Sequence, residues 1–108
     1  MVSFSHRKIK LCYLISSLCN EGPVNVVYNI IRYMDFTKFD VSIVTFIPEK
    51  ENSRLEEFRK FPIEIYQLSP NKMIGMGTIY SLLKKKLKDI HPDEIHAHCP
   101  RSLYLMPF

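Results

Sequence analysis

The densest group of side chains able to do chemistry is His-Ala-His-Cys at residues 96–99. Imidazoles two residues apart on a strand point to the same side of a sheet. A histidine can donate to a sugar hydroxyl or phosphate, or exchange a proton near neutral pH. We expect His96 to be buried and hydrogen-bonded, and His98 to emerge at a strand end as the candidate catalytic residue. No C-x-x-C pair or fourth ligand lies at ordinary spacing, so no metal site is predicted.

A second polar segment, residues 16–23, leads from an apolar run into an amphipathic one. A helix that begins there offers free amides and a positive dipole end, which favour anionic or polyhydroxylated ligands. The segment lacks G-x-G-x-x-G and G-x-x-x-x-G-K-[ST], so it predicts neither a dinucleotide nor a nucleoside triphosphate site of the usual kind. Gly22 has two interpretations: a ligand approaches the backbone closely there, or the turn needs a residue without a β-carbon.

Two basic features complete the candidate residues. Arg101 and Ser102 follow the histidines, where an arginine could hold a phosphate or carboxylate or remain solvated. Four lysines share a predicted helix: Lys84, Lys85, Lys86 and Lys88. Such a run is most often a solvated face, and it can also lie against anionic lipid.

Composition limits the class of protein. The chain has 108 residues, of which 46% are hydrophobic, so it can build a core and is not a disordered tail. A formal charge of +4 does not by itself indicate nucleic acid. Its apolar runs are shorter than a membrane span needs, no signal peptide is recognised, and three cysteines fit a reducing cytoplasm.

Apolar periodicity predicts the elements that position these residues. Strands are expected at 8–15, 41–47, 63–68 and 94–98, and helices at 23–34, 53–60 and 78–90. The second helix is expected from a capping box that begins at Ser53, in which the serine and Glu56 cap each other's amides. Strict alternation of strand and helix predicts an α/β fold, a doubly wound parallel sheet with strand order 3-2-1-4.

In that order the first and fourth strands are neighbours, and the crevice beyond their carboxyl ends is the expected binding site. Residues 16–22 and 98–102 should meet there. We expect residues 1–7 to be flexible and residues 8–108 to form one domain that is incomplete at its C-terminal end. An incomplete sheet would leave an open edge through which the chain could self-associate.

Five segments occur in order from residue 8: KIKLCYLISSL, NEGPVNVVYNIIRYMD, KFDVSIVTFIPE, PIEIYQLSP and KKLKDIHPDEIHAHCPRS. Together they resemble the N-terminal domain of glycosyltransferase family 4 (group 1), retaining enzymes of the GT-B fold. In that family two Rossmann-like domains face a cleft: the N-terminal domain mainly receives the acceptor, and the C-terminal domain holds the nucleotide sugar. The resemblance implies sugar transfer to a glycan or lipid-linked acceptor, in bacterial surface polysaccharide synthesis.

The resemblance also assigns residues. His98 matches the histidine near the transferred sugar, and Asn20, Glu21, Gly22 and Pro23 match the turn beside the sugar and phosphate, although Glu21 replaces the first glycine of a frequent Gly-Gly pair. No cofactor is implied beyond the nucleotide sugar, and the chain alone is expected to be inactive. A cytoplasmic protein, with peripheral contact to the inner face of the membrane, is expected. The alternatives are a non-catalytic binding or membrane-docking domain, or half of another sugar-nucleotide enzyme.

Overall fold

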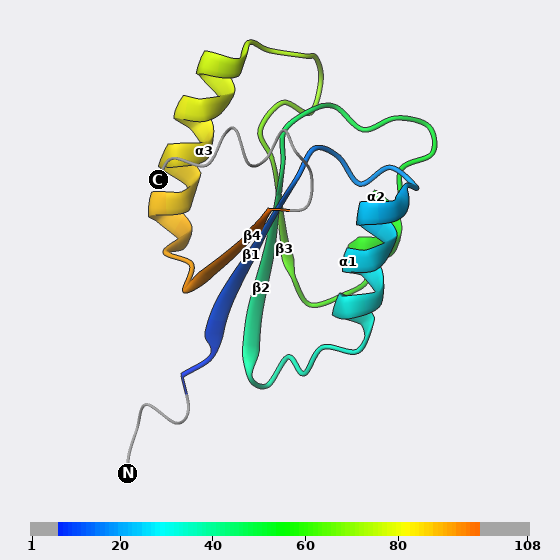
Figure 1. The fold of residues 1–108 in the computed structure, drawn as a ribbon, viewed down its shortest axis with the longest axis vertical. Helices are drawn as coiled ribbons and strands as arrows, with labels where there is room; N and C mark the ends of the chain where they lie inside the picture. Colours follow the sequence, from blue (N-terminus) through cyan, green and yellow to red (C-terminus); the bar gives the residue numbers. More distant parts are fainter. Residues whose placement is uncertain (1–6, 98–108) are drawn as a thin grey trace.

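The computed structural model describes residues 7–97, in which strands and helices alternate (Figure 1). The elements are β1 (Ile9–Ile15), α1 (Gly22–Arg32), β2 (Phe39–Thr45), α2 (Leu55–Phe58), β3 (Glu64–Gln67), α3 (Met76–Ile90) and β4 (Glu94–Ala97). The predicted order of elements is confirmed. The described helices are all too short or too polar to cross a bilayer.

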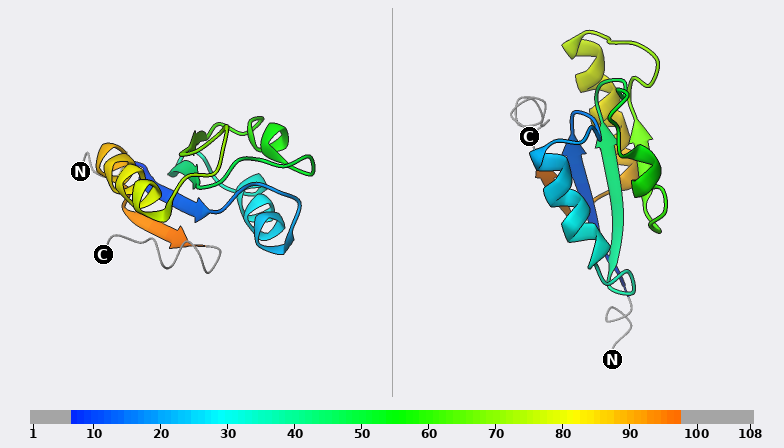
Figure 2. Two further views of the ribbon diagram at one scale, coloured as in Figure 1. Left: turned by 90° about the horizontal axis from the view of Figure 1, so that it is seen from above. Right: turned by 90° about the vertical axis from the view of Figure 1, so that its right-hand side faces the viewer.

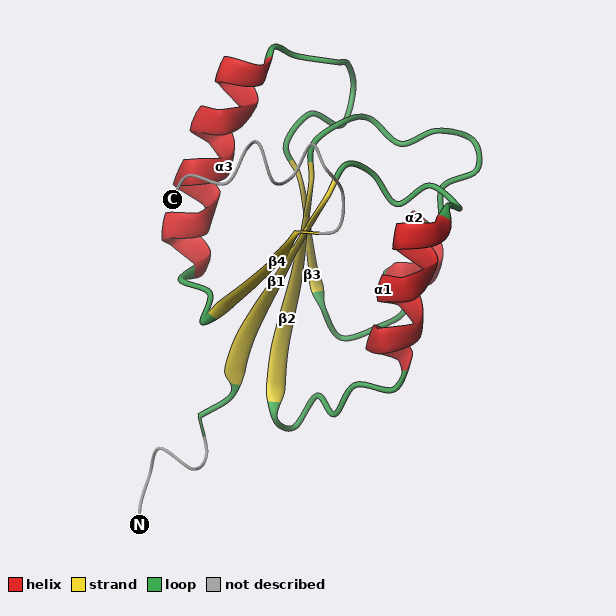
Figure 3. Ribbon diagram, in the orientation of Figure 1, coloured by secondary structure: helices red, strands yellow, loops and turns green. Residues whose placement is uncertain are grey.

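The four strands form one parallel sheet in the order β3-β2-β1-β4 (Figure 3). The register pairs Ile15 with Thr45 on one side of β1 and Leu14 with Ala97 on the other. The predicted α/β fold and strand order 3-2-1-4 are therefore confirmed, and the sheet is Rossmann-like. From β1 the chain adds β2 and β3 on one side, and β4 then pairs with the other side of β1. This change of side makes a topological switch point at the carboxyl ends of β1 and β4.

The sheet is covered on both faces, with α1 and α2 on one side and α3 on the other (Figures 1 and 2). Successive side chains of a strand alternate between the faces. In β1, Tyr13 and Ile15 pack in the α1 cluster, while Cys12 and Leu14 pack in the α3 cluster. This two-sided burial explains why β1 is apolar at nearly every position.

Each long helix buries a narrower stripe than its periodicity predicts. In α1, Val27 and Ile31 are fully buried but Ile30 is 41% exposed. In α3, Leu83 is fully buried but Leu82 is 36% exposed. Both exposed residues lie at the flank of the apolar stripe, where a single helix layer on an open sheet leaves the side chain uncovered.

A tertiary contact shifts the predicted end of one strand. β2 was expected at 41–47 but runs from Phe39 to Thr45, and it ends there since the amides of Phe46 and Ile47 both donate to the Ser16 carbonyl, at 2.9 and 3.0 Å. α3 begins at Met76, two residues before the predicted start.

The predicted capping box is only half formed. The Leu55 amide donates to Ser53 Oγ at 3.0 Å, but Glu56 pairs with Arg59 instead of returning to the Ser53 amide. That amide donates to the Lys50 carbonyl. Without the reciprocal bond, α2 is a single turn that ends at Phe58 rather than at residue 60.

Hydrogen bonds of Asp93 join the start of β4 to the start of β1. Its carboxylate accepts the Lys10 amide at 2.8 Å and an Arg7 guanidinium bond at 2.7 Å, while its own amide donates to the Lys10 carbonyl. Three residues before it, α3 ends at Ile90, and its C-cap residue His91 has a left-handed backbone with a φ of 53°. This junction sets the register of β4.

Candidate functional site

The expected crevice begins at the turn between β1 and α1, and half of that turn is not open to solvent. Ser17, Leu18 and Cys19 are all buried, and the Ser17 hydroxyl donates to Cys19 Sγ at 3.0 Å. Cys19 forms an isolated antiparallel bridge with Ser53 of the β2–α2 loop. The prediction that residues 16–22 line the crevice is therefore wrong for residues 17–19. The exposed part of the turn is Asn20 to Pro23.

Glu49 accepts hydrogen bonds from the buried part of this turn and from the β2–α2 loop. Both oxygens of its carboxylate accept the Leu18 amide at 3.0 Å, and Oε1 also accepts the Ser53 hydroxyl at 2.5 Å. The Arg54 amide adds a bond to the Leu18 carbonyl at 2.6 Å. A side chain of the protein thus already supplies an anion to the Leu18 amide, which is not available to a ligand.

The amino end of α1 remains free. Glu21 is the N-cap residue, and its side chain makes no capping hydrogen bond. Within residues 7–97 the amides of Gly22 and Val24 have no acceptor, and Pro23 between them has no amide hydrogen. The Gly22 amide, at the positive end of an 11-residue helix, is therefore exposed at the carboxyl edge of the sheet, whereas Val24 is buried in the core.

Asn20 is tied to its neighbours at this helix end, and its predicted role in binding a ligand stays a prediction. Its side-chain oxygen accepts a bond from the Asn25 amide group at 3.0 Å, and its backbone amide donates to the Asn52 carbonyl at 2.9 Å. Asn25 in turn accepts from Arg54 Nη1 at 2.6 Å. Asn20 is thus tied to both α1 and the β2–α2 loop, which holds the exposed end of the turn in place.

Gly22 is not required by the conformation of the turn. Its φ is not positive, and a β-carbon built there would meet no atom of the described residues within 4 Å. The interpretation that the turn needs a residue without a β-carbon is therefore wrong. Glycine in a helix costs roughly 0.5–1 kcal/mol relative to alanine. The other interpretation, close approach of a ligand to this backbone, stays a prediction.

The second predicted segment lies outside the described residues: His98, Cys99, Arg101 and Ser102 follow the last of them, Ala97. Ala97 pairs with Leu14, two residues before Ser16. The last described residue of β4 therefore lies beside β1, the strand that leads into the turn containing Gly22.

His96 differs from its prediction. Its side chain is 42% exposed, and Nε2 lies 3.1 Å from Glu94 Oε1. The ring centroid lies 5.3 Å from that of Tyr13. His96 was expected to be buried, but β4 is an edge strand of the described sheet and α1 packs over β1 and β2. The imidazole consequently has partners without being enclosed.

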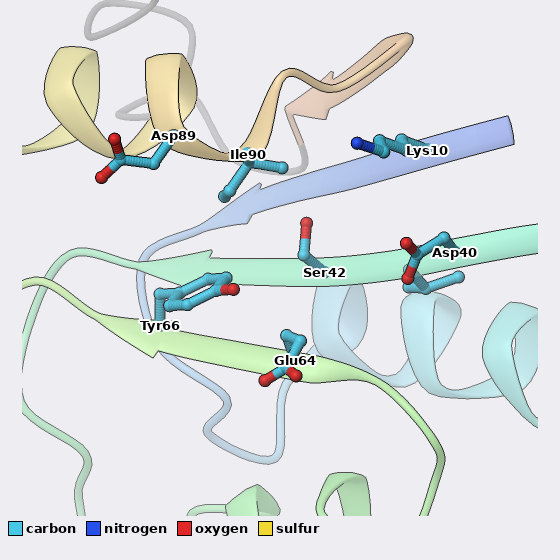
Figure 4. Close-up of a pocket in the computed structure, with 8 residues that line it drawn as sticks. Lys10, Asp40, Ser42, Glu64, Tyr66, Asp89 and Ile90 are labelled. Atoms are coloured by element: carbon cyan, nitrogen blue, oxygen red, sulfur yellow. The ribbon is translucent and has the colours of Figure 1, made fainter.

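A second hollow, of about 190 Å³, lies at the opposite end of the sheet on the α3 side (Figure 4). The charged groups around it are the carboxylates of Asp40, Glu64 and Asp89, and Lys10. Burial first, then the charges of Glu64 and Asp40, raise the pKa of the Tyr66 phenol on its wall. The hollow is therefore negative and suits a cation. Sequence reasoning did not identify it because its residues come from four elements.

Metal ligation has no basis in the described part of the chain, where no three His, Cys, Asp or Glu side chains are grouped for it. Cys12 is fully buried, and burial raises its thiol pKa to about 11, so it remains a neutral core residue.

The four lysines of α3 do not form one group. Lys84, Lys85 and Lys88 line a shallow hollow with Ser81. Lys86 instead lies over the ring of Tyr66, with its nitrogen 4.4 Å from the centroid. Three of the four predicted lysines, Lys84, Lys85 and Lys88, therefore share one surface, and Lys86 lies apart from it.

Comparison with known proteins finds no matching family model, curated protein or solved structure.

Proposed function

We propose that this chain is the acceptor-side, Rossmann-like half of a retaining glycosyltransferase of the GT-B type. Such an enzyme moves a sugar from a nucleotide-sugar donor to a glycan or lipid-linked acceptor, and bacterial surface polysaccharide synthesis is the proposed setting. The observation that carries the proposal is Gly22, which stands at the free amino end of α1 although no backbone or packing constraint requires glycine there.

The chemistry of the exposed turn supports this role. Sugar transfer from a nucleotide sugar develops negative charge on the leaving phosphate, which fixed hydrogen-bond donors stabilise. The exposed amide of Gly22 is such a donor, and the absence of a β-carbon lets a sugar or phosphate reach it. The segment resemblance assigns the same turn to the sugar and phosphate, and assigns His98 to the transferred sugar.

The sheet topology supports the same location. β1 and β4 are parallel neighbours at the switch point, where Rossmann-like sheets bind ligands beyond the carboxyl ends of their strands. Catalysis by this half alone is not proposed, because it offers one wall of a cleft and transfer requires a site closed against water.

The main alternative is a non-catalytic binding domain. Its support is the surface of Lys84, Lys85 and Lys88, which does not depend on the glycine turn. A dinucleotide-dependent sugar-nucleotide enzyme has less support, because the turn lacks the G-x-G-x-x-G pattern.

Amide chemical shifts of the isotopically labelled chain can test the proposal during titration with nucleotide sugars and oligosaccharides. We expect saturable shifts at Gly22, because its amide is exposed and has no acceptor in the described chain, and little change at Leu18, whose amide Glu49 already holds. Leu18 is thus an internal control within the same turn. Titrations in which no nucleotide sugar or oligosaccharide moves the Gly22 resonance would overturn the proposal.

A further inference from the structure

The outer face of α3 carries a concentrated positive charge. Lys84, Lys85 and Lys88 surround a hollow of about 300 Å³ together with Ser81. Lys84 and Lys85 each lie three or four residues from both Ser81 and Lys88, so the four residues share one helix face. All four residues are exposed, and the hollow is open and shallow.

The charge on this face is not neutralised by the described chain. No carboxylate of residues 7–97 forms an ion pair with Lys84, Lys85 or Lys88. Asp89 follows Lys88 and lies four residues after Lys85, but it forms no ion pair with either lysine and lines the negative hollow. Lysines at i, i+3 and i, i+4 repel one another by a few tenths of a kcal/mol per pair, so the arrangement does not serve helix stability.

The opposite face of α3 determines how the helix could meet a membrane. Ile79, Leu83 and Leu87 are buried against the sheet. An amphipathic helix that inserts into a bilayer needs its apolar face free. Because that face is occupied here, α3 can meet a membrane only through its charged side.

We propose that the surface formed by Ser81, Lys84, Lys85 and Lys88 docks on the phosphate headgroups of an anionic bilayer by electrostatic attraction, without insertion. The shallow hollow fits a row of headgroups at a flat surface, and each lysine near such a surface strengthens binding about fivefold. Lys86 takes no part, because its ammonium group lies over Tyr66. The proposal stands apart from sugar transfer and does not depend on Gly22.

The experiment compares two triple variants of equal net charge. Lys84, Lys85 and Lys88 are changed to Gln in one variant, and Lys38, Lys50 and Lys60 are changed to Gln in the other. Each variant lowers the formal charge from +4 by three. All six lysines are exposed, so both variants should fold, which circular dichroism and thermal melting would verify.

Binding is measured by sedimentation with vesicles of phosphatidylglycerol and phosphatidylcholine at low salt, and with vesicles of phosphatidylcholine alone. We expect the unchanged chain to bind the anionic vesicles only, and added salt to release it. The α3 variant should bind about a hundredfold more weakly. The matched control, and the single change Lys86→Gln, should bind nearly as the unchanged chain does.

Several outcomes would overturn the proposal. Absence of binding by the unchanged chain would do so directly, and an equal loss in both triple variants would assign binding to net charge rather than to this face. Calorimetry with inorganic phosphate and with duplex DNA separates other sources of phosphate. Tighter binding of either one to the same three lysines would replace the bilayer as the partner.

Discussion

Both oxygens of the Glu49 carboxylate lie 3.0 Å from the amide nitrogen of Leu18, which is 31 residues earlier in the chain. The same carboxylate accepts the Ser53 hydroxyl. One side chain therefore joins the loops that follow β1 and β2 at the carboxyl edge of the sheet. It also divides the β1–α1 turn into a closed part at residues 17–19 and an open part at residues 20–23.

Removal of the Glu49 carboxylate should destabilise this edge of the sheet. Leu18 is fully buried, so Glu49→Ala would leave its amide without a partner and lower the free energy of unfolding by about 1–3 kcal/mol. Glu49→Gln keeps one acceptor oxygen and should cost about 1 kcal/mol. Urea denaturation measures both, and equal stability of all three proteins would show that the contact contributes nothing.

Gly22→Ala should separate folding from function. A β-carbon at residue 22 meets open space, so the variant should be more stable by about 0.4–1 kcal/mol. The same carbon blocks close approach to the amide of residue 22, so the shift of that amide during ligand titration should weaken. Gly77→Ala on α3, where the added carbon also meets open space, is the matched control and should leave ligand binding unchanged. Equal binding by both variants would contradict the role of Gly22.

Adjacent leucines of α3 should respond very differently to truncation. Leu83→Ala removes a fully buried side chain from the cluster with Leu14 and Val44, and should cost about 2–5 kcal/mol. Leu82→Ala removes a side chain that is 36% exposed, and should change stability by about 0.5 kcal/mol or less. Thermal or urea denaturation compares them. Similar losses for the two variants would mean that α3 packs with another face.

Asp93 should make the fold sensitive to acid. Backbone bonding to Lys10, followed by the Arg7 side chain, lowers the pKa of the Asp93 carboxyl below its ordinary value of 3.8. A lowered pKa in the folded state means that its stabilisation is present above about pH 4 and is lost as the pH falls through the folded-state value. Asp93→Asn should therefore reduce stability at neutral pH and reduce the further loss in acid.

The control for Asp93 is Asp40→Asn, because the Asp40 carboxylate makes no hydrogen bond within the described chain. Its denaturation midpoints should follow the pH dependence of the unchanged chain. Asp35, whose pKa is also lowered by hydrogen bonds from Thr37, is present in both proteins and affects both profiles alike. An Asp93→Asn profile parallel to that of the unchanged chain from neutral to acid pH would remove Asp93 as the cause.

The alternation of elements, the parallel sheet and the strand order could all be predicted from the sequence. Their signals are local: β1 is apolar on both faces, and Ile79, Leu83 and Leu87 recur at helical spacing. Right-handed crossovers then leave few ways to arrange four parallel strands. The predicted lysine surface was correct for Lys84, Lys85 and Lys88, because residues three and four apart share a helix face whatever the fold.

Other features depend on contacts between distant residues and were decided only by the tertiary structure. The Glu49–Leu18 contact closes part of the predicted crevice, and the position of β4 at an edge leaves His96 exposed. Lys86 leaves the lysine surface because Tyr66 of β3 lies beneath it. Periodicity predicts which side chains share a face of a helix or strand. Only the folded chain determines which residues pack against that face, and this packing decides whether a polar group is buried, hydrogen-bonded or exposed.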